Sequence, residues 1–406
     1  FTANNITDEE MHEVATCTNP ASGEPAEVLD RIVFNIGSLS RLRKYAASYP
    51  NSNVCIRVNP DVDAGEHRIV KTGTAKCKFG IAIESMPEVA KIVQDHGMHI
   101  IGLHQHTGSG ISDPAKLTKA VSRMFEAASA LYKAGQLEHL RFIDIGGGFK
   151  VPYRPDDKPI PLGLLASSIA QLVRGLLDEH PELKHGDLVL NLEPGKFLVA
   201  DCGHLLLTAN TLKERAVVDP DTGHKTHHRI VGTDSGFNHL IRPVLYDAYH
   251  QIVNLQSHHQ RGGNEDAELD DAEMVFQYDV AGNICESGDL FATERPLRRI
   301  REGDLLEVRN AGAYCRSMAS EYNMRGFPNE VTVLYSNLQP EHVGDFPTPL
   351  VTDTVATAAL GAMGHYDSAA VVVRTKLTYK RRTSQELVNK FLSDYGVKST
   401  LDSDVQ

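Results

Sequence analysis

The feature that most constrains the fold is a regular alternation of short apolar runs with helical patterns over the first half of the chain. Five runs have the character of buried strands: 32–36, 54–58, 100–104, 142–145 and 188–192. The segments between them repeat apolar residues with a helical period, most clearly over 117–131, where Asp113-Pro114 is a typical helix start and Gly135 a typical stop. Ser85 could cap a further helix that runs through Val93. This alternation predicts a parallel β-sheet covered by helices.

The residues that follow each run favour a closed barrel over an open, doubly wound sheet. They read NIGS, RVNP, HQHTGSG, DIGGGF and LEPGK, and so they are polar or rich in glycine at every strand end. In a (β/α)8 barrel the chemistry lies at these C-terminal ends, and the barrel needs eight strands where five complete ones are visible here. We therefore expect a TIM-type (β/α)8 barrel that is incomplete at its N-terminus, with the first two strands and most of a third preceding Phe1.

The second half of the chain has a different pattern, in which β-type runs are separated by Gly, Asn and Asp turns. The runs lie at 230–233, 275–280, 305–308, 331–335 and 369–374, and little helical periodicity accompanies them. This pattern is typical of an antiparallel β domain. The sequence thus predicts two domains, a barrel over 1–204 and a β domain over 205–406.

Charge and cysteine content narrow the class of protein. The chain has 41 Lys and Arg against 53 Asp and Glu, a formal charge of −12, which argues against a nucleic-acid or membrane surface. No apolar run approaches the roughly 20 residues of a membrane span. Six cysteines are scattered without a CxxC pair, as in reduced intracellular proteins. We expect a cytoplasmic protein that binds neither nucleic acid nor a membrane.

Two strand ends of the barrel carry candidate cofactor ligands. Gly146, Gly147 and Gly148 expose backbone N–H groups where barrel loops often bind phosphate, and Ser109 could add a hydroxyl to the same anion. Glu193, at the next strand end, could keep a pyridine nitrogen protonated, as the chemistry of pyridoxal phosphate (PLP) requires. The alternatives are a tight turn without a ligand and an ordinary loop carboxylate.

His104 and His106 are two residues apart, so a strand points both side chains the same way. Such a pair could hold zinc in a barrel hydrolase, but a zinc site needs further His and Asp ligands from other strand ends. Those ends offer glycine, proline and one Glu, so we expect no metal and prefer stacking of His106 on a flat cofactor. The histidine-rich segment 223–228 is interpreted as a solvated turn.

Three segments of the second domain combine reactive side chains. Arg242 and Tyr246 lie four residues apart in IRPVLYD, Cys285 and Glu286 begin CESGD, and Tyr314 ends NAGAY. Each has an ordinary alternative, namely a surface Arg, a buried Cys or a packed Tyr, and it is the joint order of the segments that singles them out.

That order resembles the alanine-racemase-fold PLP decarboxylases, most closely the diaminopimelate decarboxylase family. Ten motifs follow the family's order from Phe1 to about Tyr335: TANNITDEEM, NIGSLSRL, RVNPDV, CKFGI, HQHTGSG, DIGGGF, EPGK, IRPVLYDAYH, CESGD and NAGAYCRSMASEYN. The last three point to the diaminopimelate branch rather than the ornithine branch. The resemblance implies a PLP-dependent carboxy-lyase of lysine biosynthesis, which converts meso-2,6-diaminopimelate at its D-centre to L-lysine and CO2.

The resemblance also implies a role for each candidate. The implied cofactor ligands are His106, which stacks on the ring, and Ser109, Gly146, Gly147, Gly148, Glu193 and Tyr314. The implied substrate ligands are Lys196, Arg242, Tyr246 and Glu286. Cys285 would donate a proton, and together with Glu286 it would reach across a homodimer interface into the partner's active site.

Several positions depart from the family pattern. The family's Schiff-base lysine lies at the end of barrel strand one, which we expect before Phe1, and Lys78 belongs to a different motif. Lys196 and Asn283 replace a usual arginine and proline, 17–29 resembles an insertion, and 341–365 has no counterpart. Three alternatives stay open: a related decarboxylase of another basic amino acid or carboxylated polyamine, a non-catalytic decarboxylase-like regulatory protein, and a metal-dependent barrel hydrolase.

Overall fold

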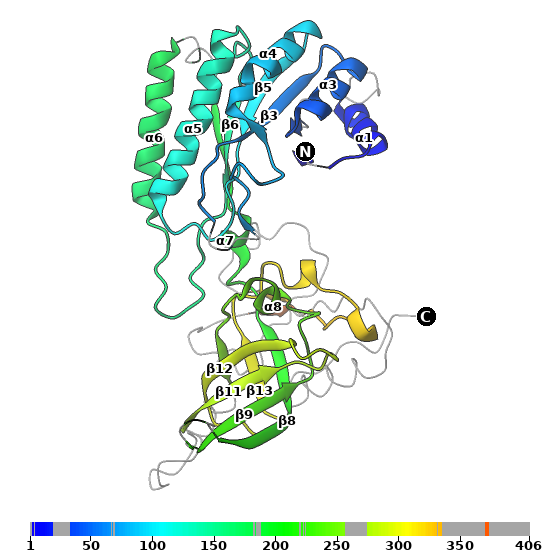
Figure 1. Ribbon diagram of the computed structural model, residues 1–406, viewed down its shortest axis with the longest axis vertical. Coiled ribbons are helices and arrows are strands. Elements are labelled where there is room, and N and C mark those ends of the chain that lie inside the picture. Colours follow the sequence, from blue (N-terminus) through cyan, green and yellow to red (C-terminus); the bar gives the residue numbers. More distant parts are fainter. Residues whose placement is uncertain are drawn as a thin grey trace. The chain divides into compact units, whose positions relative to one another are not determined.

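The computed structural model of the chain divides into two compact units, Phe1–Ala200 and Asp201–Gln406 (Figure 1). It describes residues 2–3, 5–18, 33–65, 67, 70–181, 183, 188–218, 221, 223, 225–255, 274–330, 332–334 and 370–372. Most of the expected insertion at 17–29 and all of 341–365 lie outside these residues. No helix among the described residues is long and apolar enough to cross a bilayer.

The first unit is built on a seven-stranded sheet in which all the strand pairs are parallel. Its strands are β1 (Thr2–Ala3), β2 (Phe34–Ile36), β3 (Asn53–Asn59), β4 (Ile81–Ala82), β5 (His99–His104), β6 (Phe142–Gly147) and β7 (Val189–Glu193). They lie in the order β1-β2-β3-β5-β6-β7, and β4 pairs with the C-terminal end of β3. The predicted parallel sheet is confirmed, whereas β4 was not predicted, because two residues are too few to form a recognisable run.

Helices cover the sheet of the first unit as the apolar periodicity predicts. They are α1 (Asp8–Thr18), α3 (Leu39–Ser48), α4 (Met86–Asp95), α5 (Pro114–Lys133), α6 (Leu162–Glu179) and the short α7 (Gly195–Val199). The side chain of Asp113 accepts a hydrogen bond from the N–H of Ala115, which confirms the predicted start of α5. The predicted cap of α4 by the Ser85 side chain is wrong, because a 3-10 turn, η3 (Ile83–Ser85), leads directly into the helix.

The core of the first unit lies between the central strands and these helices. Val54, Ile56 and Leu103 of β3 and β5 are fully buried, and α4, α5 and α6 lie side by side (Figure 1). The exception is β7, the last strand in the order, whose apolar sequence predicts burial on both faces but whose side chains are mostly exposed. The C-terminal ends of β5 and β6 are therefore held by a packed core.

The second unit contains a six-stranded sheet and few helices. Its strands, in spatial order, are β10 (Ile252–Asn254), β13 (Leu305–Val308), β8 (Leu205–Val218), β9 (Lys225–Thr233), β11 (Val275–Ala281) and β12 (Leu290–Arg298). Every pair is antiparallel except β9–β11, which is parallel. The remaining elements are α8 (Arg242–Tyr246), the 3-10 turns η7 (Arg316–Met318) and η8 (Tyr322–Met324), and the separate pair β14 (Thr332–Leu334) and β15 (Ala370–Val372). The predicted β domain is confirmed, with one parallel pair added.

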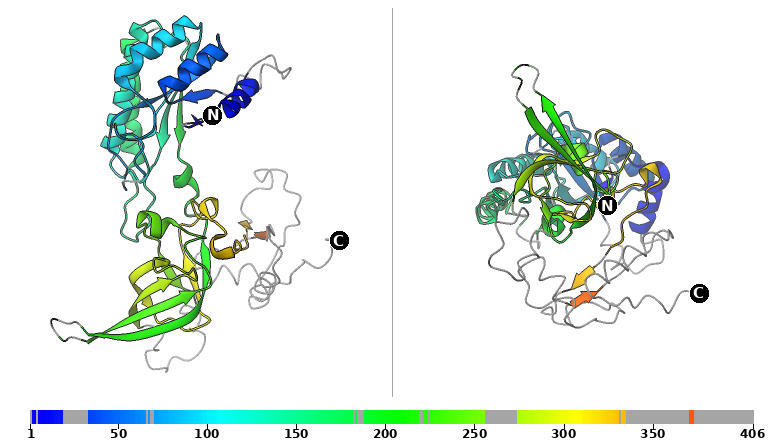
Figure 2. Two further views of the ribbon diagram at one scale, coloured as in Figure 1. Left: turned by 45° about the vertical axis from the view of Figure 1, so that its right-hand side comes forward. Right: turned by 90° about the horizontal axis from the view of Figure 1, so that it is seen from below.

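The long strands β8 and β9 form a ribbon that extends beyond the rest of their sheet (Figure 2). The interpretation of 223–228 as a solvated turn is wrong in part, because β9 already begins at Lys225. His227 and His228 stand on this strand and pair with Glu214 and Asp279, at 2.6 and 2.9 Å. These two histidines thus pair with carboxylates on neighbouring strands.

Candidate functional site

Three strand ends of the first unit meet at one place. His104 at the end of β5 lies in register with Asp144 of β6, and Gly147 at the end of β6 lies in register with Glu193 of β7. The loop after β5 continues the contact, since the N–H of Ile111 donates to the carbonyl of Gly148 at 2.8 Å. The segments HQHTGSG, DIGGGF and EPGK, far apart in sequence, are therefore bound into one surface.

The three glycines are required by close backbone contacts. A Cβ atom at Gly147 would lie 1.8 Å from the carbonyl oxygen of Glu193, and one at Gly148 would lie 1.9 Å from that of Gly108. Gly146 and Gly148 also have positive φ angles, 71° and 89°, which favour glycine. The strand ends can approach each other this closely only because these positions lack side chains.

Two of the three glycine N–H groups have acceptors within the protein, so fewer backbone donors than expected are available to a phosphate. The N–H of Gly146 donates to Asp144 Oδ1 at 2.8 Å, and that of Gly147 donates to His106 Nδ1 at 3.1 Å. Among the described residues, Gly148 alone of the three has an N–H without an acceptor. Ser109, in the turn between Gly108 and Gly110, is partly exposed.

His106 presents an uncharged ring at this surface. Burial lowers the pKa of its imidazole to about 4, so the ring is neutral at pH 7. Since Nδ1 accepts the hydrogen bond from Gly147, the single ring proton is on Nε2. Neutral aromatic rings stack readily on flat heteroaromatic molecules.

Glu193 is the anion of the site. The hydrogen bond from His104, with Nε2 at 3.3 Å from Glu193 Oε2, is the main cause that lowers the pKa of this carboxyl below its ordinary value. The positive charge of Arg57 acts in the same direction, and partial burial opposes both. Glu193 is therefore ionised at neutral pH.

Asp144 is a second carboxyl group beside Glu193, and the sequence analysis overlooked it. Burial raises its pKa, and the negative charge of Glu193 adds to that shift. Ligand atoms of His104, Asp144 and Glu193 lie within 4.8 Å of one another, and in the described part of the chain no other such group could hold a metal. Asp144 lies inside β6, three residues before its end, and the sequence analysis gave a role only to the glycines that follow it.

Arg57 of β3 is a further residue that the sequence analysis did not single out. It is buried, with its guanidinium 4.7 Å from the centre of the Phe79 ring. The sequence signal that could have identified Arg57 is a charged residue inside an otherwise apolar strand. Lys78 lies 5.2 Å from the centre of the same ring, and Lys196 of α7 lies 5.7 Å from that of Tyr153.

In the second unit, Arg242 is buried rather than a surface residue. Its Nη1 lies 3.1 Å from Nε2 of His250, whose Nδ1 lies 2.9 Å from the carbonyl oxygen of Arg309. The carbonyl can only accept, so Nδ1 of His250 carries the proton and Nε2 accepts from the guanidinium. Tyr246, at the other end of α8, is half-buried.

The CESGD turn is bound to the loop that precedes α8, residues 234–240. Asp289 accepts hydrogen bonds from the N–H groups of Phe237 and Ile284 at 2.6 and 2.7 Å. The N–H of Asn283 donates to the carbonyl of Ser235 at 2.9 Å, a bond that the family's usual proline could not make. Asp289 is buried, whereas Cys285 and the adjacent Glu286 are exposed at the turn.

The segment after Tyr314 is bound to the same loop. Asn238 and Ser320 exchange two hydrogen bonds, of 2.8 and 3.1 Å, and His239 Nε2 donates to the carbonyl of Gly326. Tyr314 itself is exposed and has a positive φ angle of 57°. Tyr322, which the sequence analysis did not select, donates from its hydroxyl to Glu286 Oε1 at 2.6 Å. Loop 234–240 thus brings the three predicted segments of this unit together.

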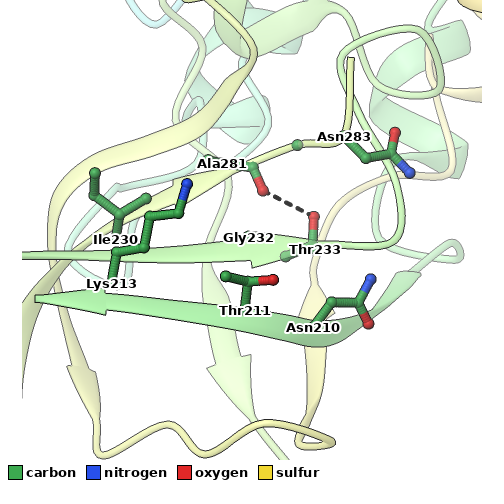
Figure 3. Close-up of a pocket in the computed structure, with 9 residues that line it drawn as sticks. Asn210, Thr211, Lys213, Ile230, Gly232, Thr233, Ala281 and Asn283 are labelled. Carbon is green, nitrogen blue, oxygen red and sulfur yellow. Dashed lines mark hydrogen bonds between the residues drawn. The ribbon is translucent and has the colours of Figure 1, made fainter. Parts of the chain in front are cut away.

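A surface cavity of the second unit lies between β8, β9 and β11 (Figure 3). Its polar lining comes from Asn210, Thr211, Lys213, Thr233 and Asn283. Thr233 donates to the carbonyl of Ala281 at 3.0 Å across it. None of the predicted site residues lines this cavity.

Both units are similar to domains of known proteins. A model described as "Pyridoxal-dependent decarboxylase, pyridoxal binding domain" matches residues 4–200, and one described as "Pyridoxal-dependent decarboxylase, C-terminal sheet domain" matches 178–312. The diaminopimelate decarboxylase of Methanothermobacter thermautotrophicus is 37% identical over 82% of this chain, and that of Aquifex aeolicus is 33% identical over 79%. The chain spans 69% and 64% of these two relatives, about two thirds of their length.

Solved structures of diaminopimelate decarboxylases are also similar to this chain. The structure of diaminopimelate decarboxylase from Helicobacter pylori complexed with L-lysine has a TM-score of 0.64 and 27% identity, covering 82% of this chain and 72% of that one. The Methanocaldococcus jannaschii enzyme in complex with L-lysine has a TM-score of 0.62 and 28% identity, covering 82% and 68%.

Replacing Gly147 with alanine should misplace Glu193, because the new Cβ would overlap its carbonyl oxygen. We predict a loss of about 1–3 kcal/mol in the free energy of unfolding, measured by urea denaturation. Gly175→Ala is the control, since its Cβ would meet nothing within 4 Å on α6 and should stabilise that helix. Equal stability of the two variants would contradict the proposed contact.

The His106 ring should stay neutral well below pH 6. Because burial lowers its pKa from 6.5 to about 4, the stability that comes from the neutral ring is present above pH 6.5 and is lost as the pH falls through 4. NMR titration of the imidazole signals, assigned with His106→Asn, should give a midpoint near 4. A midpoint near 6.5 would show that the ring is not buried in this way.

Proposed function

Because the chain belongs to the pyridoxal-dependent decarboxylases, we propose that it catalyses the PLP-dependent decarboxylation of meso-2,6-diaminopimelate to L-lysine and CO2. Curated relatives that are 31–37% identical are named diaminopimelate decarboxylase, and two solved relatives hold L-lysine. The observation in this chain that carries the proposal is the pairing of an ionised Glu193 with a neutral His106 ring beside the glycine turn.

Family membership confirms the resemblance identified from the ten motifs. The matched domains also confirm the predicted fold class, a barrel-type pyridoxal-binding domain followed by a β-sheet domain. PLP is the cofactor of this family. The position of the Schiff-base lysine stays a prediction.

The residues at the three strand ends fit PLP. Glu193 offers an ionised carboxylate to a protonated pyridine nitrogen, and a carboxylate beside that nitrogen favours its protonated form. His106 offers a neutral ring for stacking. The N–H of Gly148 and the hydroxyl of Ser109 offer donors for the phosphate, and Gly146 and Gly147 shape the turn by their close contacts. Bound PLP acts as an electron sink for the carbanion that remains when CO2 leaves.

We assign the substrate residues by their chemistry. The buried Arg242 guanidinium, oriented by His250, would bind the distal carboxylate, and the carboxylate of Glu286, held by Tyr322, would bind an amino group. Lys196 and Tyr246 would complete the contacts, and Tyr314 would lie against the cofactor. A substrate with a second carboxylate suits a buried arginine better than a diamine does, which favours diaminopimelate over the polyamine alternative.

We further propose a homodimer with shared active sites, in which Cys285 protonates the carbanion in the partner's site. The exposure of Cys285 and Glu286 at the tip of a braced turn supports this arrangement, because groups that serve a partner must be accessible. Five cysteines among the described residues are free thiols, which supports a cytoplasmic location. The net charge of −12 supports the absence of nucleic-acid and membrane partners.

Full-length protein purified from its source and supplied with PLP should convert meso-diaminopimelate to equal amounts of L-lysine and CO2. Glu193→Gln should lower kcat/KM at least about 100-fold with an unchanged circular dichroism spectrum, because the ring nitrogen loses its anionic partner. The control is Glu84→Gln, which changes a highly exposed carboxylate on η3. No lysine from the wild-type protein would contradict the function, and full activity of Glu193→Gln would contradict the cofactor assignment.

Arg242→Gln should raise KM for meso-diaminopimelate at least roughly 30-fold, with a smaller effect on kcat, because a buried charge–charge contact is lost. Steady-state kinetics would measure this, with Arg316→Gln as the matched control at an exposed arginine. A KM equal to that of the wild type would exclude Arg242 from substrate binding.

A further inference from the structure

His104 is the buried group at the three strand ends to which the proposed function gives no role. It is the last residue of β5 and is only 3% exposed. His106 Nδ1 lies 3.7 Å from Glu193 Oε2, whereas His104 Nε2 is within hydrogen-bond distance of that oxygen. A buried imidazole beside two carboxyl groups and an arginine is chemically costly unless its hydrogen bonds are used.

The hydrogen bond of His104 has a defined direction. Its Nε2 lies 3.3 Å from Glu193 Oε2, and an ionised carboxylate can only accept, so Nε2 is the donor. The other ring nitrogen, Nδ1, is buried and has no hydrogen-bond partner among the described residues. The ring therefore makes a single hydrogen bond, and that bond ends on Glu193.

Asp144 competes with Glu193 for negative charge. Negative charge on either of two carboxyl groups this close makes ionisation of the other less favourable. Asp144 accepts from the N–H of Gly146, and Glu193 accepts from His104. The pKa directions agree with this division, since that of Asp144 is raised by burial and that of Glu193 is lowered, mainly by His104. The other charged or titratable groups that interact with Glu193 are His106, Arg57 and the buried Cys55.

From this geometry we infer that His104 is a positioning residue, which orients the Glu193 carboxylate and stabilises its negative charge. This inference rests on the proposed function, because it concerns the carboxylate that would face the pyridine nitrogen. Without the donor, the Glu193 carboxylate loses the hydrogen bond that orients and stabilises it, and the ring nitrogen of a bound pyridoxal compound loses affinity for its proton.

The test uses 15N-labelled pyridoxine 5′-phosphate, which has the ring and phosphate of PLP but no aldehyde to react with lysines. The 15N chemical shift of the bound ring reports directly whether its nitrogen is protonated. We expect a protonated nitrogen at pH 7.5 in the wild-type protein. In His104→Leu the proton affinity should fall at least tenfold, seen as a shift of one pH unit or more in the NMR titration.

Two further variants separate positioning from folding. His104→Gln keeps an N–H donor of similar reach and should restore much of the proton affinity, whereas His104→Met, a flexible apolar side chain, should not. His180→Gln is the matched control, because His180 is a buried histidine at the end of α6. If His104→Leu does not fold, the comparison of the Gln and Met variants decides the question.

Three results would overturn the inference or its premise. A ring nitrogen as fully protonated in the Leu and Met variants as in the wild type would refute the role of His104. Stoichiometric zinc retained by the wild type after chelation, and lost in His104→Leu, would assign His104, Asp144 and Glu193 to a metal instead. Absence of pyridoxine 5′-phosphate binding to the wild type would refute the cofactor assignment itself, a failure distinct from that of the inference.

Discussion

The first unit depends on the backbone contact between the ends of β6 and β7. Gly147 lies against the carbonyl of Glu193 with no room for even a methyl group, and Gly148 lies equally close to Gly108. These contacts bring three strand ends within hydrogen-bond distance of one another. Glu193 thereby reaches His104, and the charge distribution of the site follows from that single hydrogen bond together with the burial of His106.

In the second unit, too, distant segments are held together at one place, but by a buried side chain rather than by close backbone contacts. Here a buried carboxylate, Asp289, accepts two backbone N–H groups, and loop 234–240 collects the segments around it. The reactive side chains Cys285 and Glu286 are exposed, and the groups that hold their turn are buried. In both units the candidate side chains thus stand at strand ends, in short helices and in turns that close backbone contacts and hydrogen bonds hold in place.

Much of the fold could be predicted from the sequence, because the helical period and the strand runs are local signals. The two-residue strand β4 and the Ser85 cap could not, since both depend on neighbouring turns. Glu193 and His106 of the first unit were selected from the sequence, whereas Asp144 of that unit and Tyr322 of the second unit were not. His104 was weighed only as a zinc ligand. Their significance arises from contacts between residues far apart in sequence, such as the 89 positions between His104 and Glu193. The internal hydrogen bonds of Gly146 and Gly147 were equally invisible to a motif.

The ionisation of Glu193 is the central claim, and 13C NMR titration of the labelled carboxyl groups tests it most directly. Signals would be assigned with Glu193→Gln and Asp144→Asn. We predict that Glu193 titrates below its ordinary pKa of 4.5, while Asp144 titrates above its ordinary pKa of 3.8. The reverse order, with Glu193 raised and Asp144 lowered, would contradict the proposed division of charge and the role of Glu193 toward the cofactor.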